Sequence, residues 1–243
     1  MTPVAHTGEG EIVRVRVWDL VVRSTHWLIA LSLAVLAVTG FEIGNPVLIS
    51  PGPAEDRFVM GMVRAVHFYT AIVFTLAVLS RIAWMFVGKG HASWREYVPV
   101  EADRRAGFWP MLAFYMFLRK RPIPVVGHNP LAAAAYALVF GLYVVMIVTG
   151  LGMYAIDADP SSPVAWTKAL LPIFGGVTGA RWVHHVAMWL LLGFFVHHLY
   201  SAVLTSVVER NGTMESIFTG SKWVPRALAD EDAARGEAKR AAK

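Results

Sequence analysis

The stretch WVHHVAMWLLLGFFVHHLYSAVLTSVV, residues 182–208, is apolar along most of its length and yet contains four histidines. An α-helix turns by about 100° per residue, so the 14 steps from His184 to His198 return the chain to within about 40° of the same face, about 21 Å farther along the axis. Pairings across this gap that use His185 or His197 fall about 120° to 140° out of line, and these two are expected to face lipid or neighbouring helices. One helix therefore presents two imidazoles, those of His184 and His198, on one stripe at two depths.

The composition is that of an integral membrane protein. Of 243 residues, 56% are hydrophobic and 16% are charged, and the mean hydropathy is +0.51. Apolar runs long enough to cross a bilayer lie at 27–43, 66–87, 131–155 and 182–208, and each should be helical because lipid offers the backbone no hydrogen-bond partners. An aromatic-rich run at 108–118 is too short to span and is expected to be an interfacial or re-entrant segment. We predict an all-α, integral membrane four-helix bundle with a short interfacial segment.

The polar segments set the domain limits. Residues 1–223 are predicted to form one transmembrane domain, and residues 224–243, which are rich in alanine and mixed charge, a mobile polar tail. Pro/Gly-rich loops are expected at 45–56 and at 157–179, the second with room for a short helix near 164–171. The first apolar run follows a polar stretch and lacks a small-residue cleavage site, so it is expected to remain as a span.

Lysines and arginines are distributed unevenly around the four runs. The N-terminal tail, the connection after the second run and the C-terminal tail hold most of them, whereas the opposite side has only Arg57, Arg64, Lys168 and Arg181. The positive-inside rule then places both termini in the cytoplasm. The net charge of +5 follows from this asymmetry, and basic residues that flank spans do not indicate nucleic-acid binding.

The chain has no cysteine. This excludes iron–sulfur clusters ligated by this chain, thiolate zinc sites, covalent c-type haem and disulfides. Any bound metal must therefore be held by imidazole.

The alternation of helix direction sorts the histidines of the runs by depth. His67 and His184 fall at the outer level, whereas His26 falls at the cytoplasmic level together with His198. Two matched pairs are what bis-imidazole haem ligation between facing helices requires. We predict two b-type haems, the outer held by His67 and His184 and the inner by His26 and His198. A lone intramembrane histidine is often only hydrogen-bonded between helices, but four at two matched depths favour iron ligation.

Haem propionates need cationic partners near the membrane surfaces. The arginines that precede a histidine by three residues are Arg23, Arg64 and Arg181. Arg81 lies inside an apolar run, where an unpaired charge is costly, so it is predicted to meet an inner-haem propionate. Arginines at helix ends also snorkel to lipid headgroups, which is the alternative interpretation.

A short repeat links the first and third runs. Val38-Thr39-Gly40 and Val148-Thr149-Gly150 lie near their outer ends. Glycines there would let a flat ligand or a neighbouring helix approach the backbone. Gly40 follows His26 by 14 residues and falls on the same face at outer-haem depth, where a side chain would collide with the haem ring.

These motifs resemble a known family. RSTHW at 23–27 with Thr39-Gly40, GHNPLA at 127–132, and RWVHHVAMW at 181–189 with HLY at 198–200 are similar to the cytochrome b subunit of membrane-bound nickel–iron uptake hydrogenases. The likeness covers roughly residues 14–223. It implies two b haems on His26, His67, His184 and His198, a periplasmic partner made of an iron–sulfur small subunit and a nickel–iron large subunit, and electron transfer to quinone.

His128 and Asn129 resemble the quinone-contacting loop of the more distant formate dehydrogenase cytochrome b subunits. Near this loop, Asp19 and Glu209 are possible proton donors. A helix-capping turn at 127–130 explains the same residues equally well. Outside the runs, His6, His91 and His128 are expected to be solvated unless His128 serves quinone.

Two alternatives stay open. Within redox chemistry, the chain could be a stand-alone quinone-linked di-haem cytochrome or the anchor of another periplasmic dehydrogenase. In a different class, it could be a metal or haem transporter, although transport favours broken helices and the four runs show little interruption. No catalytic residue is predicted, and whether the chain counts as an enzyme depends on the hydrogen:quinone oxidoreductase complex it joins.

Overall fold

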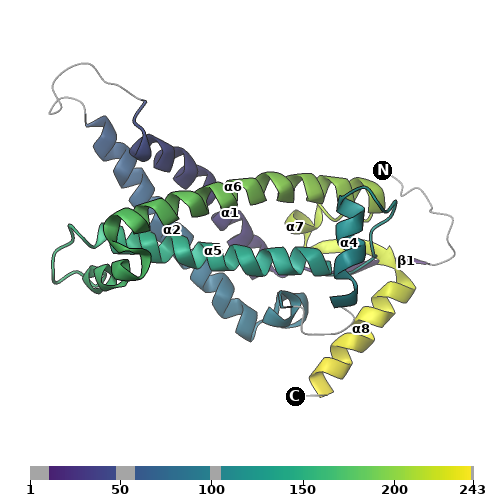
Figure 1. Ribbon diagram of the computed structural model, residues 1–243. Coiled ribbons are helices and arrows are strands. Elements are labelled where there is room, and N and C mark those ends of the chain that lie inside the picture. Colours follow the sequence, from purple (N-terminus) through teal and green to yellow (C-terminus); the bar gives the residue numbers. More distant parts are fainter. Residues whose placement is uncertain (1–10, 48–57, 99–104, 242–243) are drawn as a thin grey trace. The chain divides into compact units, whose positions relative to one another are not determined.

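The computed structural model describes residues 11–47, 58–98 and 105–241. Within them, four helices are long and apolar enough to cross a membrane, namely α1 (Leu20–Gly44), α2 (Val59–Val87), α5 (Pro130–Tyr154) and α6 (Gly176–Glu209) (Figure 1). They coincide with the four predicted apolar runs and extend most of them by up to about two turns. The prediction of a helical, multi-pass membrane protein is therefore confirmed.

The chain divides into two compact units. The helical unit comprises residues 24–85 and 136–197, and the terminal unit comprises the described residues within 1–23, 86–135 and 198–243. All four helices contribute residues to both units, and α2 gives only Phe86 and Val87 to the terminal unit.

The core of the helical unit draws on all four spans. Phe74 and Val78 of α2 pack with Ile29 of α1, Tyr143 of α5 and Leu191 of α6. The rings of Phe74 and Tyr143 meet edge to face with centroids 5.3 Å apart, an arrangement that aromatic quadrupoles favour. This core holds α1, α2, α5 and α6 together.

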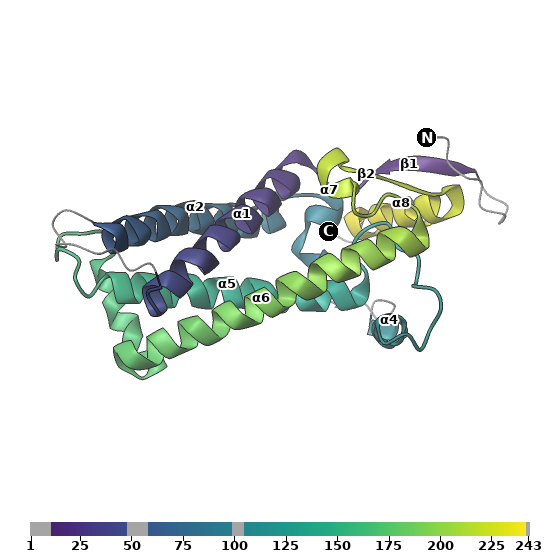
Figure 2. The same cartoon turned by 90° about the horizontal axis from the view of Figure 1, so that it is seen from above.

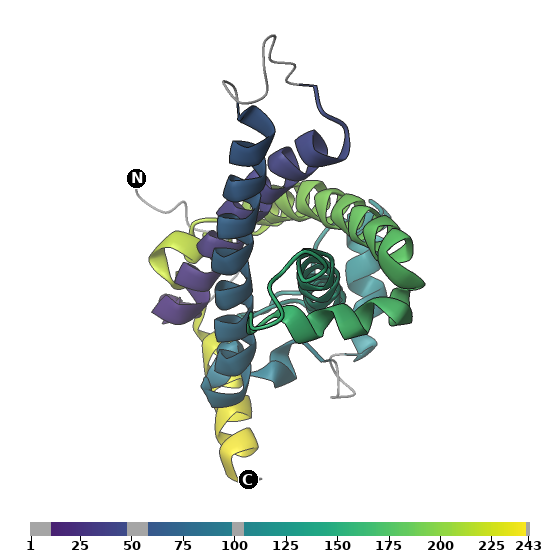
Figure 3. The same ribbon diagram turned by 90° about the vertical axis from the view of Figure 1, so that its left-hand side faces the viewer.

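A short helix lies on the loop between α5 and α6, as predicted near residues 164–171. It is the 3₁₀ helix η3 (Ala165–Phe174), which leads into α6 (Figure 3). The Thr167 hydroxyl donates to the Leu151 carbonyl oxygen at 3.0 Å and so fastens η3 to the end of α5. The other predicted loop, at 45–56, lies almost entirely outside the described residues, as does Arg57.

The terminal unit contains a two-stranded antiparallel sheet that the sequence analysis did not predict. Strand β1 (Ile12–Arg16) pairs with β2 (Ser221–Pro225), with Ile12 opposite Pro225 and Arg16 opposite Ser221 (Figure 2). The short helix α7 (Ser216–Thr219) precedes β2 and ends at Gly220. The sheet joins the two ends of the described chain.

Short helices of the terminal unit lie between α2 and α5 in the described residues. They are η1 (Gly90–Ala92), η2 (Trp94–Glu96) and α4 (Phe108–Tyr115). The helix α4 matches the predicted interfacial segment at 108–118, and its placement at the membrane interface stays a prediction.

The predicted polar tail at 224–243 begins inside β2 and continues as helix α8 (Arg226–Ala241). Alanine and long charged residues are strong helix formers, and Arg235 pairs with Glu231 one turn earlier at 2.7 Å. The tail is therefore helical, and its mobility stays a prediction.

Candidate functional site

His67 of α2 meets the first Val-Thr-Gly tripeptide, which lies in α1. Thr39 Oγ1 is 2.8 Å from His67 Nδ1. The same oxygen is 2.7 Å from the Val35 carbonyl oxygen, one turn earlier in its own helix. A Cβ atom on Gly40 would lie 3.5 Å from His67 Cε1. The threonine thus bonds the imidazole, and a Cβ atom at the next position would meet the ring in ordinary van der Waals contact.

The same arrangement occurs between α5 and α6. Thr149 Oγ1 is 2.8 Å from His184 Nδ1 and 2.7 Å from the Val145 carbonyl oxygen. A Cβ atom on Gly150 would lie 3.4 Å from His184 Cε1. Thr149 is fully buried. The short repeat noted in the sequence therefore builds one local geometry twice, once around each of two predicted ligands.

These two histidines fit axial ligation of haem iron. Each is bonded through Nδ1, which leaves Nε2 to bind a metal. Within the described parts of the chain, no group of three or more His, Asp or Glu side chains is arranged to hold a metal ion. A porphyrin supplies four iron ligands itself, so two imidazoles suffice.

The other two predicted ligands belong to different units. His26 is half-buried in the part of α1 that belongs to the helical unit, and His198 is half-buried in the part of α6 that belongs to the terminal unit. Their pairing stays a prediction.

His185, the neighbour of His184, points in another direction. Its Nδ1 is 2.9 Å from the Arg181 carbonyl oxygen, and a Cβ atom on Gly44 would lie 2.8 Å from its Nε2. His185 therefore packs against α1, in keeping with the expectation that it faces a neighbouring helix.

The predicted propionate partners differ in exposure. Arg64 and Arg181 are exposed, whereas Arg81 is buried at 4% exposure next to the core residues Ala77 and Val78. Arg23 Nη2 donates to the Phe218 carbonyl oxygen, within the terminal unit. The buried position of Arg81 is one where a charge requires compensation, and contacts of all four arginines with propionates stay predictions.

Asn129 caps α5. Its Oδ1 accepts a hydrogen bond from the Ala132 backbone N–H at 2.8 Å, which is the bond of an N-cap residue. Its Nδ2 donates to Tyr115 Oη at 3.2 Å. The capping interpretation of this turn therefore holds, and a contact with quinone would be additional.

His128 packs between two aromatic rings instead of lying in an open loop. Its ring centroid is 4.5 Å from that of Trp18 and 5.1 Å from that of Tyr97. Trp18 is buried and its Nε1 donates to Ser216 Oγ at 2.9 Å.

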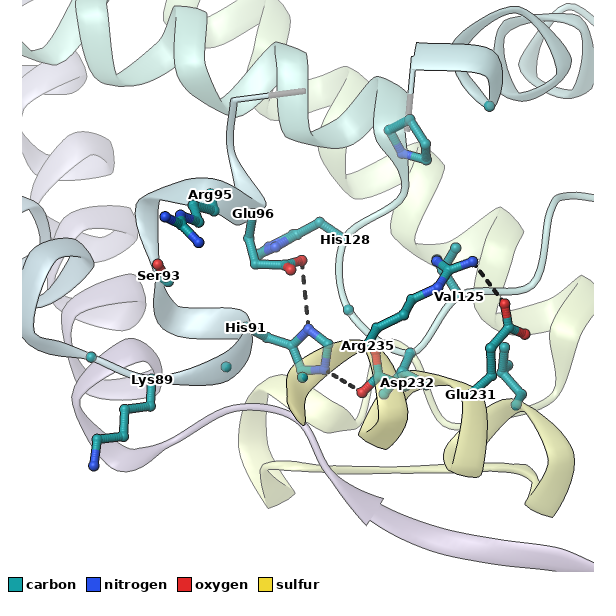
Figure 4. A pocket seen from close by; sticks show the side chains of 18 of the residues that line it. Lys89, His91, Ser93, Arg95, Glu96, Val125, His128, Glu231, Asp232 and Arg235 are labelled. Carbon is teal, nitrogen blue, oxygen red and sulfur yellow. Dashed lines mark hydrogen bonds and ion pairs between the residues drawn. The ribbon is translucent and has the colours of Figure 1, made fainter. Parts of the chain in front are cut away.

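A cavity of about 1020 Å³ lies within the terminal unit, lined by the 86–96 and 123–130 segments and by α8 (Figure 4). His91 on its wall contacts Asp232 at 3.1 Å and Glu96 at 3.5 Å. Burial opposes the charge of His91, but hydrogen bonds and the charges of Asp232 and Glu96 outweigh it and raise the pKa of His91 to about 9. The expectation that His91 is solvated is wrong, because Glu96 in the next short helix and Asp232 in the distant helix α8 both reach its ring.

Comparisons with known proteins point to one group. A sequence model of the family described as prokaryotic cytochrome b561 matches residues 17–220. The chain is 37% identical over 213 residues to the probable Ni/Fe-hydrogenase B-type cytochrome subunit of Cupriavidus necator, covering 84% of this chain and 85% of that protein. It is 37% identical over 227 residues to the protein of the same name in Bradyrhizobium diazoefficiens, with 89% and 90% covered. It is 35% identical over 211 residues to the probable Ni/Fe-hydrogenase 1 B-type cytochrome subunit of Escherichia coli K12, with 84% and 88% covered.

Proposed function

The chain belongs to the prokaryotic cytochrome b561 family, and from this we propose that it is the membrane subunit that carries electrons from a periplasmic nickel–iron hydrogenase to quinone. Its relatives are named as B-type cytochrome subunits of Ni/Fe hydrogenases. A b-type cytochrome binds haem b, which supplies a one-electron redox couple when bound. Four apolar helices make the chain a membrane anchor as well.

The two His–Thr pairs carry this proposal. His67 and His184 are held in matching geometry by Thr39 and Thr149, and we assign them as the axial ligands of an outer haem. His26 and His198 are assigned to an inner haem on the depth that their helices give them. Propionates would be met by Arg23, Arg64, Arg81 and Arg181.

The direction across the membrane rests on the basic residues. They gather at the termini and after α2, which favours cytoplasmic termini in a bacterial inner membrane. The loop that carries η3 then faces the periplasm, where the iron–sulfur small subunit of the hydrogenase would dock with its nickel–iron large subunit. Electrons would enter on that side and leave toward the cytoplasmic side.

Quinone is assigned to the terminal unit. A quinone site needs an apolar slot with a few polar groups, and the cavity beside His128 offers apolar walls together with a charged histidine. Asn129 lies next to His128 in the same turn and is included in the assignment. Asp19 and Glu209 remain candidate proton donors.

Haem counting with neighbouring variants tests the ligand assignment. The protein purified in mild detergent should contain two b haems, and His184→Leu should contain one. His185→Leu is the matched control, because His185 packs on α1 through Gly44, and it should keep both haems. His198→Leu and His197→Leu form a second pair of the same design. A wild-type protein without a b-type optical band ends the redox assignment.

Identification of the proteins that co-purify with the chain tests the proposed nickel–iron hydrogenase partner. Nickel and iron–sulfur clusters should co-purify with the chain from native membranes. Co-purification of a different dehydrogenase, or of none, would instead favour the anchor of another enzyme or a stand-alone cytochrome. The unbroken helix α6, which carries four histidines, weighs against a metal or haem transporter.

A further inference from the structure

Thr39 and Thr149 each have one hydroxyl proton and two kinds of neighbour that could accept a hydrogen bond from it, namely backbone carbonyl oxygens and an imidazole nitrogen. Carbonyl oxygens only accept hydrogen bonds, whereas an imidazole nitrogen donates or accepts according to its tautomer. Thr39 Oγ1 lies 2.7 Å from the Val35 carbonyl oxygen and 3.3 Å from that of Leu36. The hydroxyl proton therefore goes to the carbonyls, since this is the only way in which both neighbours are satisfied.

The oxygen of the threonine is then the acceptor for the histidine. His67 Nδ1, at 2.8 Å from Thr39 Oγ1, must carry the proton of this bond. A neutral imidazole has one N–H, so Nε2 keeps its lone pair. The hydrogen bond thus selects the tautomer whose free nitrogen is the one farther from the backbone.

Thr149 repeats the same proton arrangement around His184. Its hydroxyl has the Val145 and Met146 carbonyl oxygens at 2.7 and 3.3 Å, and its oxygen is 2.8 Å from His184 Nδ1. The three corresponding distances are the same at the two sites. Agreement at two places that are more than a hundred residues apart makes a chance contact a poor explanation.

We propose that Thr39 and Thr149 are positioning residues that fix the Nδ1–H tautomer of His67 and His184, so that Nε2 of each faces the iron of one haem. This inference rests on the proposed function, because it takes these histidines as axial ligands. A Cβ atom at Gly40 or Gly150 would lie in ordinary van der Waals contact with the Cε1 atom of its histidine, so the threonines alone carry this positioning role. Both threonines act on the same haem.

The bond also tunes the iron. A hydrogen bond donated from Nδ1 increases the basicity of the imidazole, which favours ferric over ferrous iron and lowers the reduction potential. Thr149 is fully buried, so water cannot replace its hydroxyl there. Loss of either threonine hydroxyl should therefore raise the potential of the same haem.

The test compares Thr39→Val and Thr149→Val with Thr75→Val. Thr75 of α2 donates to the Ala71 carbonyl oxygen at 2.7 Å in the same way, and within the described residues no histidine bonds to it. Redox titration of the purified protein, followed optically, measures each haem separately. We expect either Val variant to weaken the ferric preference of one haem about tenfold, an upward shift of about 59 mV for a one-electron couple, and Thr75→Val to leave both potentials unchanged.

Serine variants keep the test decisive if a valine variant loses haem. Thr39→Ser and Thr149→Ser retain the hydroxyl and should restore both haem content and potential. Failure of serine to restore them overturns the proposal. So does an unchanged potential in a haem-replete valine variant, or a shift of two different haems by the two variants. A wild-type protein without haem refutes the proposed function and this inference together, whereas haem-replete variants with normal potentials refute only the inference.

Discussion

His91 Nε2 lies 3.1 Å from Asp232 Oδ2, and this ion pair joins the 3₁₀ helix η1 to the C-terminal helix α8. Glu96 flanks the other ring nitrogen at 3.5 Å. The pKa of His91, raised to about 9 from its ordinary value of 6.5, makes the attachment of α8 dependent on pH.

Because the folded-state pKa of His91 lies above the unfolded value, its stabilisation is complete below about pH 6.5 and is lost as the pH rises through about 9. The chain has no cysteine, so Glu237→Cys provides a unique spin-label site on α8. We expect the label to gain mobility with a midpoint near pH 9. Asp232→Asn should increase the mobility already at pH 7. A label whose mobility is the same from pH 6 to pH 10 would contradict the pairing.

Variants of Asn129 distinguish its role as the cap of α5 from a role in quinone binding. Asn129→Ala removes the cap of α5 and should cost about 1 kcal/mol, whereas Asn129→Asp keeps a side-chain acceptor for the Ala132 N–H. If Nδ2 also serves quinone, both variants should slow quinone reduction while both haems remain. Unchanged turnover in haem-replete Asn129→Ala would remove Asn129 from the quinone site.

Gly220 ends α7 in a left-handed conformation, with φ of 81°. A Cβ atom there would lie 2.7 Å from the Trp18 carbonyl oxygen, which belongs to rigid backbone. Gly220→Ala should destabilise the terminal unit by more than about 1 kcal/mol. Gly212→Ala is the matched control, since φ is 75° but the nearest atoms are 3.9 Å away. The difference between their thermal midpoints in detergent measures the clash, and equal midpoints would refute it.

Trp18 links several segments of the terminal unit. It is 7% exposed, stacks near His128 and donates to Ser216. Trp18→Ala should cost about 3–5 kcal/mol because it leaves a cavity. Trp18→Phe keeps most of the ring and loses mainly the hydrogen bond, at about 1 kcal/mol. The rate of protease cleavage in this unit should follow the same order, and a Phe variant cleaved as fast as the Ala variant would show that the indole N–H dominates.

The four spans could be predicted because the backbone of a long apolar run in a bilayer has to form its hydrogen bonds within the run, as a helix does. The common depth of His67 and His184 was inferred from the direction of their helices and stays a prediction, whereas the Val-Thr-Gly repeat was visible in the sequence. The role of its threonines was not, because whether a hydroxyl meets a histidine on the next helix depends on helix rotation and spacing, which hydropathy does not specify.

The structure of the terminal unit could not be predicted from patterns in the sequence. The alternating residues of β1, IVRVR, read as a polar tail because their partner strand lies about two hundred residues away. His91 was misjudged for the same reason, since Asp232 reaches it from α8. Both errors concern contacts between segments that are more than a hundred residues apart, and such a separation leaves no local pattern.

The two His–Thr bonds each close inside a single helical hairpin, across 28 residues in α1–α2 and 35 in α5–α6. Domains fold largely in order of synthesis, and contacts of short sequence separation form fastest. During biogenesis, therefore, each histidine can form its hydrogen bond with the threonine as soon as the second helix of its own hairpin enters the bilayer. Neither polar side chain is left unpaired in lipid until a later part of the chain has been synthesised.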